Sequence, residues 1–334
     1  MNKRVGKQTV ATEGVYIKAT AAIGGTKEKE GLLKDDFDVL IPNAEWGEET
    51  WEKTESKMQK EVLKIAARKA EIEIAELNYI FAGDLLNQCI GAGFGFRDIG
   101  VPYYGIYGAC STMIEGIGLG AMLIGGNCAD NLAAVTSSHF CTAERQYRMP
   151  LEYGGQRTPT AQWTVTGSGC AILSGCGVGP KVTHVTTGKI MDMGVKDANN
   201  MGGAMAPAAY DTLLNHFKDT GRNPDYYDMI FTGDLGTVGR EILVELLGEK
   251  NYDISKNYND CGCMIYDLKE QDVHAGGSGC GCIGSVFCGH IMNEMLRGKW
   301  NKILMVGTGA MLSTTSGLQG ESVPGIAHLI AVER

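Results

Sequence analysis

Along the first half of the chain, segments whose hydrophobic positions have the spacing of a β-strand alternate with segments that have the spacing of an α-helix. Apolar runs that predict strands lie at residues 15–22, 77–82, 103–107, 132–137 and 161–173. Helical spacing or helix-forming composition predicts helices at residues 48–74, 84–92 and 111–126. Strands separated by helices are typical of right-handed crossovers and of a mostly parallel sheet that is covered on both faces.

The second half of the chain repeats this plan. Strands are predicted at residues 181–189, 229–232, 302–306 and 326–332, and helices at 201–218, 238–247 and 278–296. Residues 108–138 and 277–309 are each a helix of small residues followed by a strand. Each Gly in a helix costs about 1 kcal/mol relative to Ala, a cost that close packing of a buried helix can offset. We therefore predict an internal duplication with two buried central helices, dividing near Gly175 into halves of residues 1–175 and 176–334.

Composition and charge narrow the class of protein. The chain has 334 residues, of which 44% are hydrophobic and 21% charged, and its net charge is −9. The electrostatic field of a negatively charged chain does not attract nucleic acid. Any anionic ligand would need hydrogen-bond donors or positive charges at its own binding site. The N-terminus lacks the apolar core of a secretion signal, and the longest apolar segment, residues 114–126, is shorter than the ~20 residues of a membrane span. We expect a soluble chain of the cytoplasmic type.

The eleven cysteines allow two interpretations. Two Cys-x-Cys pairs, Cys261 with Cys263 and Cys280 with Cys282, could supply four thiolates to a zinc ion. Zinc sites usually space each pair by two or more residues, and small buried cysteines are common in a reducing compartment. The second interpretation is favoured, so we expect no metal site and no cofactor.

One cysteine stands apart because of its local context. Residues 103–107 predict a strand, Gly108 and Ala109 follow it, and Cys110 then opens the small-residue helix. The small neighbours would let the backbone bring this sulfur close to a ligand. Cys110 is thus either a reactive or ligand-contacting thiol, or a buried residue where a helix happens to begin.

Three stretches carry a resemblance to a known family. The segments "YGIYGACSTMIEG", "HFCTAERQYRMPLEYGGQRTPTAQWTVTGSG" and "FTGDLGTVGRE" are similar to the stage V sporulation protein AD family. The duplicated halves resemble, over essentially the whole chain, the thiolase and ketoacyl-synthase superfamily. The resemblance implies an α/β, thiolase-like fold: two duplicated βαβαβαββ halves with two central buried helices, in αβαβα layers.

Enzymes of this superfamily use a cysteine at a helix N-terminus, where backbone N–H groups and the helix dipole favour the thiolate. Cys110 matches that position as a relic nucleophile. Where the enzymes carry their histidine motif, this chain has "FTGDLGTVG", which contains Gly233 and no histidine. Where the enzymes carry their second cysteine, this chain has Met305 nearby. His274, in "DVHAGGSGCG", resembles the thiolase histidine turn without its proline and is the possible relic base. The proton-transfer set is therefore largely missing.

The family resemblance also implies a ligand, dipicolinic acid (pyridine-2,6-dicarboxylate). Guanidinium groups pair with carboxylates and aromatic rings stack on a pyridine, so the polar segment 138–159 is the candidate binding region. Its arginines and aromatics are Arg145, Arg148, Arg157, Tyr147, Tyr153 and the nearby Trp163. The alternative is a solvated loop in which the arginines pair with Glu144 and Glu152. Further candidate ligand contacts are His139, Lys189, Lys196, Asn199 and His274.

Calcium is the remaining candidate ion. Asp130, Asp234 and Glu241 offer the oxygen ligands that calcium prefers. No run of residues resembles a calcium-binding loop, so calcium would arrive with the ligand.

The leading hypothesis is a non-catalytic protein that binds dipicolinic acid, alone or as its calcium chelate, for uptake into the developing spore and release in germination. The resemblance implies the other stage V sporulation A membrane proteins as partners, a peripheral location at the inner spore (forespore) membrane, and a homodimer. The alternative is an acyl-thioester condensing enzyme or acyltransferase with Cys110 as nucleophile and His274 or His139 as base. A third hypothesis is a structural scaffold for a membrane complex.

Overall fold

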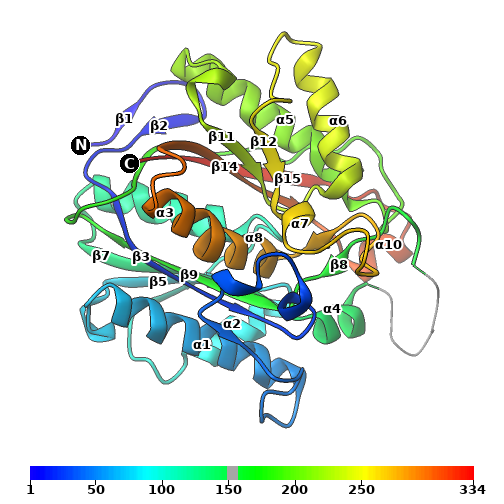
Figure 1. Cartoon of the computed structure of the whole chain (residues 1–334), viewed down its shortest axis with the longest axis horizontal. Coiled ribbons are helices and arrows are strands. Elements are labelled where there is room, and N and C mark those ends of the chain that lie inside the picture. Colours follow the sequence, from blue (N-terminus) through cyan, green and yellow to red (C-terminus); the bar gives the residue numbers. More distant parts are fainter. Residues whose placement is uncertain (149–156) are drawn as a thin grey trace.

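Each half of the chain contributes strands to its own part of a large sheet in the computed structural model, which describes residues 1–148 and 157–334 (Figure 1). The first part contains β3 (Tyr16–Gly24), β4 (Val39–Leu40), β5 (Tyr79–Gly83), β6 (Tyr103–Gly105), β7 (Asn131–Ser138) and β9 (Gly167–Ser174). The second contains β10 (Lys181–Thr186), β11 (Met229–Thr232), β12 (Tyr258–Asp260), β14 (Lys302–Ala310) and β15 (Gly325–Glu333). Two short strands near the N-terminus, β1 (Lys3–Arg4) and β2 (Thr9–Ala11), run beside β10, and β8 (Trp163–Thr164) pairs separately with β13 (Gly277–Ser278).

The strand order is β12-β11-β14-β15-β10-β3-β9-β7-β5-β6. Strand β3 joins β10 through the pair Lys181 and Tyr16, and β2 pairs with β10 through residues 9–11. Strand β5 is parallel to β6 and β7, and β11 is parallel to β12 and β14. The central strands β3, β9, β10 and β15 pair antiparallel with their neighbours in this order, and β3 also pairs parallel with the short β4. The expectation of a mostly parallel sheet is therefore wrong, because β9 and β15 pair antiparallel with β7 and β14.

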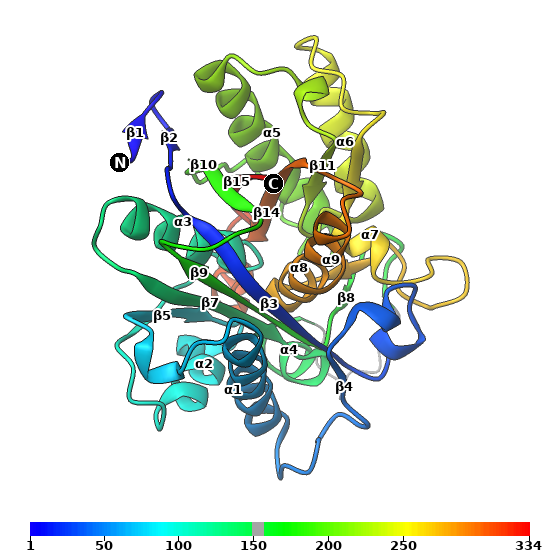
Figure 2. The same ribbon diagram turned by 60° about the vertical axis from the view of Figure 1, so that its left-hand side comes forward.

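Helices form three layers around the two parts of the sheet. The outer helices are α1 (Trp51–Lys69) and α2 (Ile90–Phe96) on one side, and α5 (Met201–Thr220) and α6 (Gly236–Gly248) on the other. Between the sheets run α3 (Thr112–Gly125) and one continuous helix built from α8 (Cys280–Val286), the π-helical turn η7 (Phe287–Ile291) and α9 (Met292–Leu296). Figures 1 and 2 show these two helices enclosed by strands on both sides. The predicted αβαβα fold with two central helices is confirmed.

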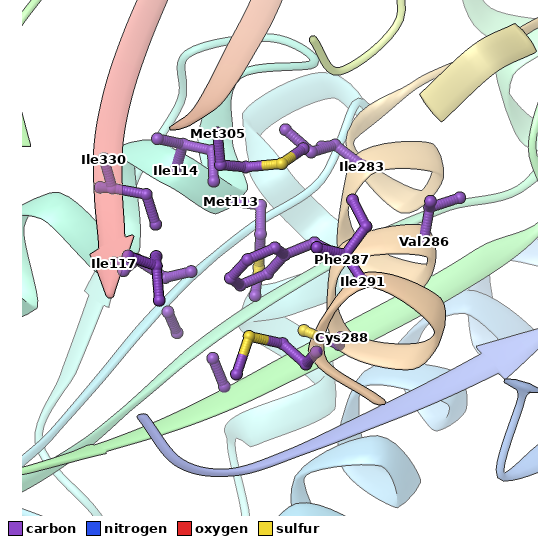
Figure 3. Close-up of a cluster of buried hydrophobic side chains, with 14 of the residues drawn as sticks. Met113, Ile114, Ile117, Ile283, Val286, Phe287, Cys288, Ile291, Met305 and Ile330 are labelled. Atoms are coloured by element: carbon purple, nitrogen blue, oxygen red, sulfur yellow. The ribbon is translucent and has the colours of Figure 1, made fainter. Parts of the chain in front are cut away.

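The middle layer owes its packing to small residues. In Figure 3, Met113 and Ile117 of α3 and Phe287 of η7 fill the space beside Met305 of β14. The helix α8 lies so close to β9 that a Cβ atom on Gly169 would fall 2.1 Å from the carbonyl oxygen of Gly284. Only glycine permits this approach of two backbones, which is the physical reason for the glycine-rich pattern of these helices.

Short elements were the ones that the hydrophobic pattern did not predict. Helices α4 (Phe140–Gln146), α7 (Cys261–Met264) and α10 (Thr314–Leu318) lie in segments without clear periodicity. The helix expected at residues 84–92 begins later, because Gln88 and Cys89 adopt left-handed backbone angles. Single 3₁₀ turns occur at η1 (Glu28–Glu30), η2 (Lys34–Asp36), η3 (Ile74–Glu76), η4 (Asn87–Cys89) and η6 (Pro224–Tyr226). Among the helices of residues 1–148 and 157–334, none is both long enough and apolar enough to cross a membrane.

Candidate functional site

A cavity of about 650 Å³ opens beside Cys110. One wall is the segment 85–89, which follows β5, and the opposite wall is the segment 310–315, which runs from the end of β14 into α10. The described residues that line it are Leu85, Leu86, Asn87, Gln88, Cys89, Tyr107, Ala109, Cys110, Tyr147, Arg148, Met201, Ser278, Ala310, Met311, Leu312, Ser313, Thr314 and Thr315. Both halves of the chain therefore contribute to one site.

Three long helices begin at this cavity. Cys110 lies two residues before α3, Met201 is the first residue of α5, and Ser278 lies two residues before α8. The N-terminus of a helix carries a partial positive charge and unpaired N–H groups, which favour anions. The starts of these helices therefore favour an anionic ligand, although the net charge of the chain is −9.

Cys110 is held by the turn that leads into α3. Ala109 has a left-handed backbone (φ 50°), and the turn packs against β14, where a Cβ on Gly309 would lie 2.4 Å from the carbonyl oxygen of Gly108. The Cys110 side chain is only 5% exposed. Burial, together with the nearby carboxylate of Asp234, raises the pKa of the Cys110 thiol well above its usual value. In the enzymes, the surroundings of the cysteine at this position favour its thiolate form. The surroundings of Cys110 instead favour the neutral thiol.

Asp234 is the residue of the site whose role the sequence pattern did not reveal. It follows β11, is fully buried, and its carboxylate is, after burial, the next cause of the raised pKa of the Cys110 thiol. Its Oδ1 accepts a hydrogen bond from Thr308 Oγ1 at 2.7 Å, and its Oδ2 accepts one from the backbone N–H of Gly279 at 2.8 Å. Burial raises the pKa of Asp234 to about 6, and these donors limit the rise. The sequence indicates this carboxylate only as a candidate calcium ligand.

Arg148 is the cation of the cavity wall among the described residues. Its Nη1 donates to the carbonyl oxygen of Gln162 at 2.7 Å and to Thr164 Oγ1 at 2.6 Å, and its Nη2 lies 3.6 Å from Met201 Sδ. All three partners are neutral, and Arg148 forms no ion pair with a carboxylate of residues 1–148 or 157–334. No carboxylate of the described residues therefore competes with a ligand for its charge.

The other two arginines of the predicted binding region lie outside the cavity lining. Arg145 forms an ion pair with Glu52 and lies over the ring of Trp51. Arg157 stacks on Trp163, with 4.4 Å between the guanidinium carbon and the ring centroid, and pairs with Asp272 at 3.1 Å. A cation therefore stacks on an aromatic ring in this region, but neither residue lines the cavity that holds Cys110. Tyr153 and Glu152 lie outside the described residues.

The two candidate histidines have local partners instead of facing the cavity. His139 is buried and caps α4: its Nδ1 accepts from the backbone N–H of Cys141, and its Nε2 lies 2.9 Å from the carbonyl oxygen of Ala44. Burial lowers its pKa, so the ring is neutral at pH 7. His274 has a left-handed backbone (φ 51°), and its Nε2 lies 3.1 Å from a carboxylate oxygen of Asp272. Neither ring lines the cavity that holds Cys110.

The remaining polar candidates are dispersed over the surface. Lys189 pairs with Asp211 at 2.9 Å, and the backbone N–H of Asn199 donates to Asp197. Neither they nor Lys196 lines the cavity, and the positions compared with the enzymes, Gly233 and Met305, are buried in the protein interior.

Three of the four cysteines of the Cys-x-Cys pairs are buried, and Cys263 is partly exposed. Cys261 and Cys263 belong to α7, Cys280 and Cys282 belong to α8, and all four are free thiols. Within residues 1–148 and 157–334, no group of three or more His, Cys, Asp or Glu side chains is arranged to hold a metal ion.

Comparison with known proteins places this geometry in a family. Over 333 residues the chain is 40% identical to stage V sporulation protein AD from Bacillus subtilis (strain 168), covering 99% of this chain and 98% of that protein. Its fold is similar to that of 3-oxoacyl-[acyl-carrier-protein] synthase III from Aquifex aeolicus VF5, with a TM-score of 0.56 and 13% identity over 98% and 100% of the two chains. A variant of OleA from Xanthomonas campestris is also similar, with a TM-score of 0.64 and 13% identity over 97% and 98% of the two chains.

At 13% identity these two solved structures establish the shared fold alone. The family model for stage V sporulation protein AD matches residues 6–333. With a thiolase-like fold, a near-full-length relative at 40% identity and this match, the chain belongs to the stage V sporulation protein AD family.

Proposed function

We propose that this sporulation protein binds dipicolinic acid, alone or as its calcium chelate, in the cavity beside Cys110, and that it does so without catalysis. The observation that carries the proposal is Arg148: a guanidinium on the cavity wall whose hydrogen-bond partners within residues 1–148 and 157–334 are all neutral. A guanidinium pairs with a carboxylate through two parallel hydrogen bonds, which is the recognition that a planar dicarboxylate offers.

The remainder of the cavity supports a small aromatic anion. The starts of α3, α5 and α8 favour negative charge, and the Tyr107 and Tyr147 rings on the wall can pack against a pyridine face. A volume of about 650 Å³ lies within the range of roughly 300–1,000 Å³ of small-molecule sites. It leaves room for a calcium ion and its waters beside a ligand as small as dipicolinate.

The role of such binding is to move the ligand into the developing spore and to release it in germination. Transport across a bilayer requires spanning segments, and the described helices contain none. We therefore propose that the other stage V sporulation A proteins supply the membrane path, and that this chain is peripheral to the inner spore membrane through them. Recovery of those proteins with the tagged chain from solubilised spore membranes tests this step; their absence from the recovered material would contradict it.

Calorimetric titration of the purified chain with dipicolinate, with and without calcium chloride, tests the binding proposal. We expect saturable binding, weakened by about 10–100-fold in Arg148→Gln, because a hydrogen bond to a charged group contributes about 1.5–3 kcal/mol. Arg145→Gln is the matched control, since Arg145 is near in sequence but pairs with Glu52 outside the cavity. Absence of saturation at millimolar ligand, or equal loss of affinity in both variants, would reject the proposal.

The alternative function is acyl-thioester condensation or acyl transfer. It is favoured by one observation, the position of Cys110 just before a central helix in a fold shared with 3-oxoacyl-[acyl-carrier-protein] synthase III. Incubation with acetyl- or malonyl-coenzyme A, followed by mass spectrometry, separates the two functions. We expect Cys110 to remain unacylated; acylation, with turnover that Cys110→Ser abolishes, would establish the enzyme.

We also propose a homodimer that forms through β6. This strand pairs only with β5 among the described strands, and Tyr103, Tyr104 and Tyr107 on and after it are exposed. An open strand edge with exposed aromatic rings is a surface that favours pairing with another strand. A second copy, presenting the same edge, would cover it with two-fold symmetry.

A further inference from the structure

Arg148, on the cavity wall, is held by two neutral oxygens, and Thr164 supplies one of them. We propose that Thr164 is a positioning residue: its hydroxyl fixes the Arg148 guanidinium so that the edge formed by Nε and Nη2 is the one that pairs with a ligand carboxylate. This inference rests on the proposed binding of an anion at Arg148, and it adds how the guanidinium is held and how the anion is oriented.

The donors of the Arg148 side chain are divided between the protein and the cavity. A guanidinium has five N–H donors, two on Nη1, two on Nη2 and one on Nε. Nη1 donates to the carbonyl oxygen of Gln162 at 2.7 Å and to Thr164 Oγ1 at 2.6 Å, so both of its hydrogens have an acceptor. Among residues 1–148 and 157–334, Nε has no hydrogen-bond partner, and Nη2 has only Met201 Sδ at 3.6 Å. A thioether sulfur is a weak acceptor, so the Nε–Nη2 edge keeps the donors that a carboxylate needs.

Thr164 is itself held in place by the elements around β8. It is fully buried, and β8 pairs in parallel with β13, where Thr164 lies opposite Ser278. The preceding residue, Trp163, stacks on Phe140 of α4 with 3.8 Å between the ring centroids. The side chain of Gln162, only 2% exposed, donates to two backbone carbonyl oxygens, one after β11 and one in β13. Both acceptors of Nη1 therefore lie on well-anchored residues, as a preorganised binding group requires.

A carboxylate that pairs with this edge would replace the weak contact with Met201. Met201 is the first residue of α5 and lines the cavity. Its sulfur lies 3.6 Å from Nη2, so an oxygen bound to Nη2 would lie beside the start of α5, where the helix dipole favours negative charge. Without the Thr164 hydroxyl, one Nη1 hydrogen would have no acceptor and the guanidinium would be free to turn. The ligand would then have to order this side chain itself, at a cost in affinity.

The first test needs no ligand. Phenylglyoxal bonds to the two terminal nitrogens of an arginine, so it should react slowly with a guanidinium whose Nη1 is held by two hydrogen bonds. Peptide mass spectrometry of the treated, folded chain follows the rate at Arg148, with the exposed Arg68 of α1 as internal reference. We expect Arg148 to react about three to ten times faster in Thr164→Val than in wild type. Equal rates in the two proteins would overturn the proposal, as would a wild-type Arg148 that reacts as fast as Arg68.

Calorimetric titration with dipicolinate is the second test. Thr164→Val should bind about three to ten times more weakly than wild type, because the ligand must order the Arg148 side chain. Thr164→Ser keeps an oxygen at this position, so both its affinity and its phenylglyoxal rate should return to within about twofold of wild type. A loss of affinity in Thr164→Val without recovery in Thr164→Ser would overturn the proposal.

A matched control separates positioning from a general loss of structure. Thr212 is also fully buried, donates to the carbonyl oxygen of Ala327 at 2.9 Å, and lies outside the cavity lining. Thr212→Val should leave both the affinity and the Arg148 rate unchanged, and equal effects in Thr212→Val and Thr164→Val would overturn the proposal. If circular dichroism shows that Thr164→Val is unfolded, Thr164→Ala replaces it with the same outcomes. If wild type binds no dipicolinate, the proposed function fails, and the phenylglyoxal rates alone decide the role of Thr164.

Discussion

Replacing Glu55 by Gln should stabilise the protein at alkaline pH and leave it nearly unchanged at acidic pH. Glu55 lies on α1 with no exposed surface, close to the buried Asp84. Its Oε1 accepts from Ser137 Oγ at 3.0 Å, and its Oε2 lies 2.9 Å from Thr142 Oγ1. The Thr142 hydroxyl also lies 2.9 Å from the carbonyl oxygen of His139. A hydroxyl has one proton for these two acceptors, so a protonated Glu55 that donates to Thr142 completes the network.

The size of the effect follows from the raised pKa. Burial, with the charge of Asp84, raises the pKa of Glu55 from 4.5 to about 8. Because the folded pKa lies above the unfolded one, the free energy of unfolding falls as the pH rises between those two values. Each pKa unit corresponds to about 1.4 kcal/mol, so ionising Glu55 costs the folded state on the order of 3–5 kcal/mol above pH 8. A glutamine keeps the shape, can donate to Thr142 Oγ1, and never ionises.

Urea unfolding at pH 5, 7 and 9 measures this difference. The free energy of unfolding of Glu55→Gln relative to wild type should increase by about 3–5 kcal/mol from pH 5 to pH 9. Glu245→Gln, at an exposed position of α6, controls for the loss of one carboxylate from the surface and should show no such trend. The histidines with lowered pKa are common to both proteins and cancel in the comparison. If the difference between Glu55→Gln and wild type is the same within about 1 kcal/mol at pH 5 and pH 9, the reasoning is refuted.

Three further predictions rest on packing, on the strand edge and on the thiol. Gly169→Ala should destabilise the fold by about 2 kcal/mol or more in urea unfolding, because its Cβ would meet the carbonyl oxygen of Gly284. Gly93→Ala, where nothing lies within 4 Å, should instead be neutral or stabilising by up to about 1 kcal/mol; equal losses would contradict the packing argument. In analytical ultracentrifugation, wild type should sediment at roughly 72 kDa, twice the chain mass of 35.8 kDa, and Tyr104→Lys should shift it towards monomer; a monomeric wild type would refute the dimer. Calorimetry should find that Cys110→Ser binds dipicolinate within about threefold of wild type, since both side chains are neutral, and a larger loss would give the sulfur a direct role.

The hydrophobic pattern predicted the long, regular elements well. Strand β11 has the predicted bounds, and α3 begins and ends within one residue of the prediction, because an apolar run between turn residues marks both. Helix α4 was missed because its seven residues are mixed in polarity and its cap is the imidazole of His139 instead of a Ser, Thr or Asp side chain. Local signals of this kind are weak in a single sequence.

The site was predicted only in part, for a related reason. Cys110 and Arg148 stand out in the sequence by position and charge, and the structure places both on the cavity wall. The partners of Asp234 are distant along the chain, with Thr308 74 positions away and Gly279 45 positions away, so no local motif joins them. Only the fold brings these three residues together.

The cavity is lined by residues from both sides of the predicted division near Gly175, and this has a thermodynamic consequence. Arg148 comes from before the predicted division and Met201 and Thr315 from after it, so an occupant would touch both predicted halves at once. A ligand that binds only when both halves are folded adds its binding free energy to their joint stability, about 2.7 kcal/mol at a hundred times its dissociation constant. Loading with ligand would therefore make the two halves melt as one unit and would slow their independent opening.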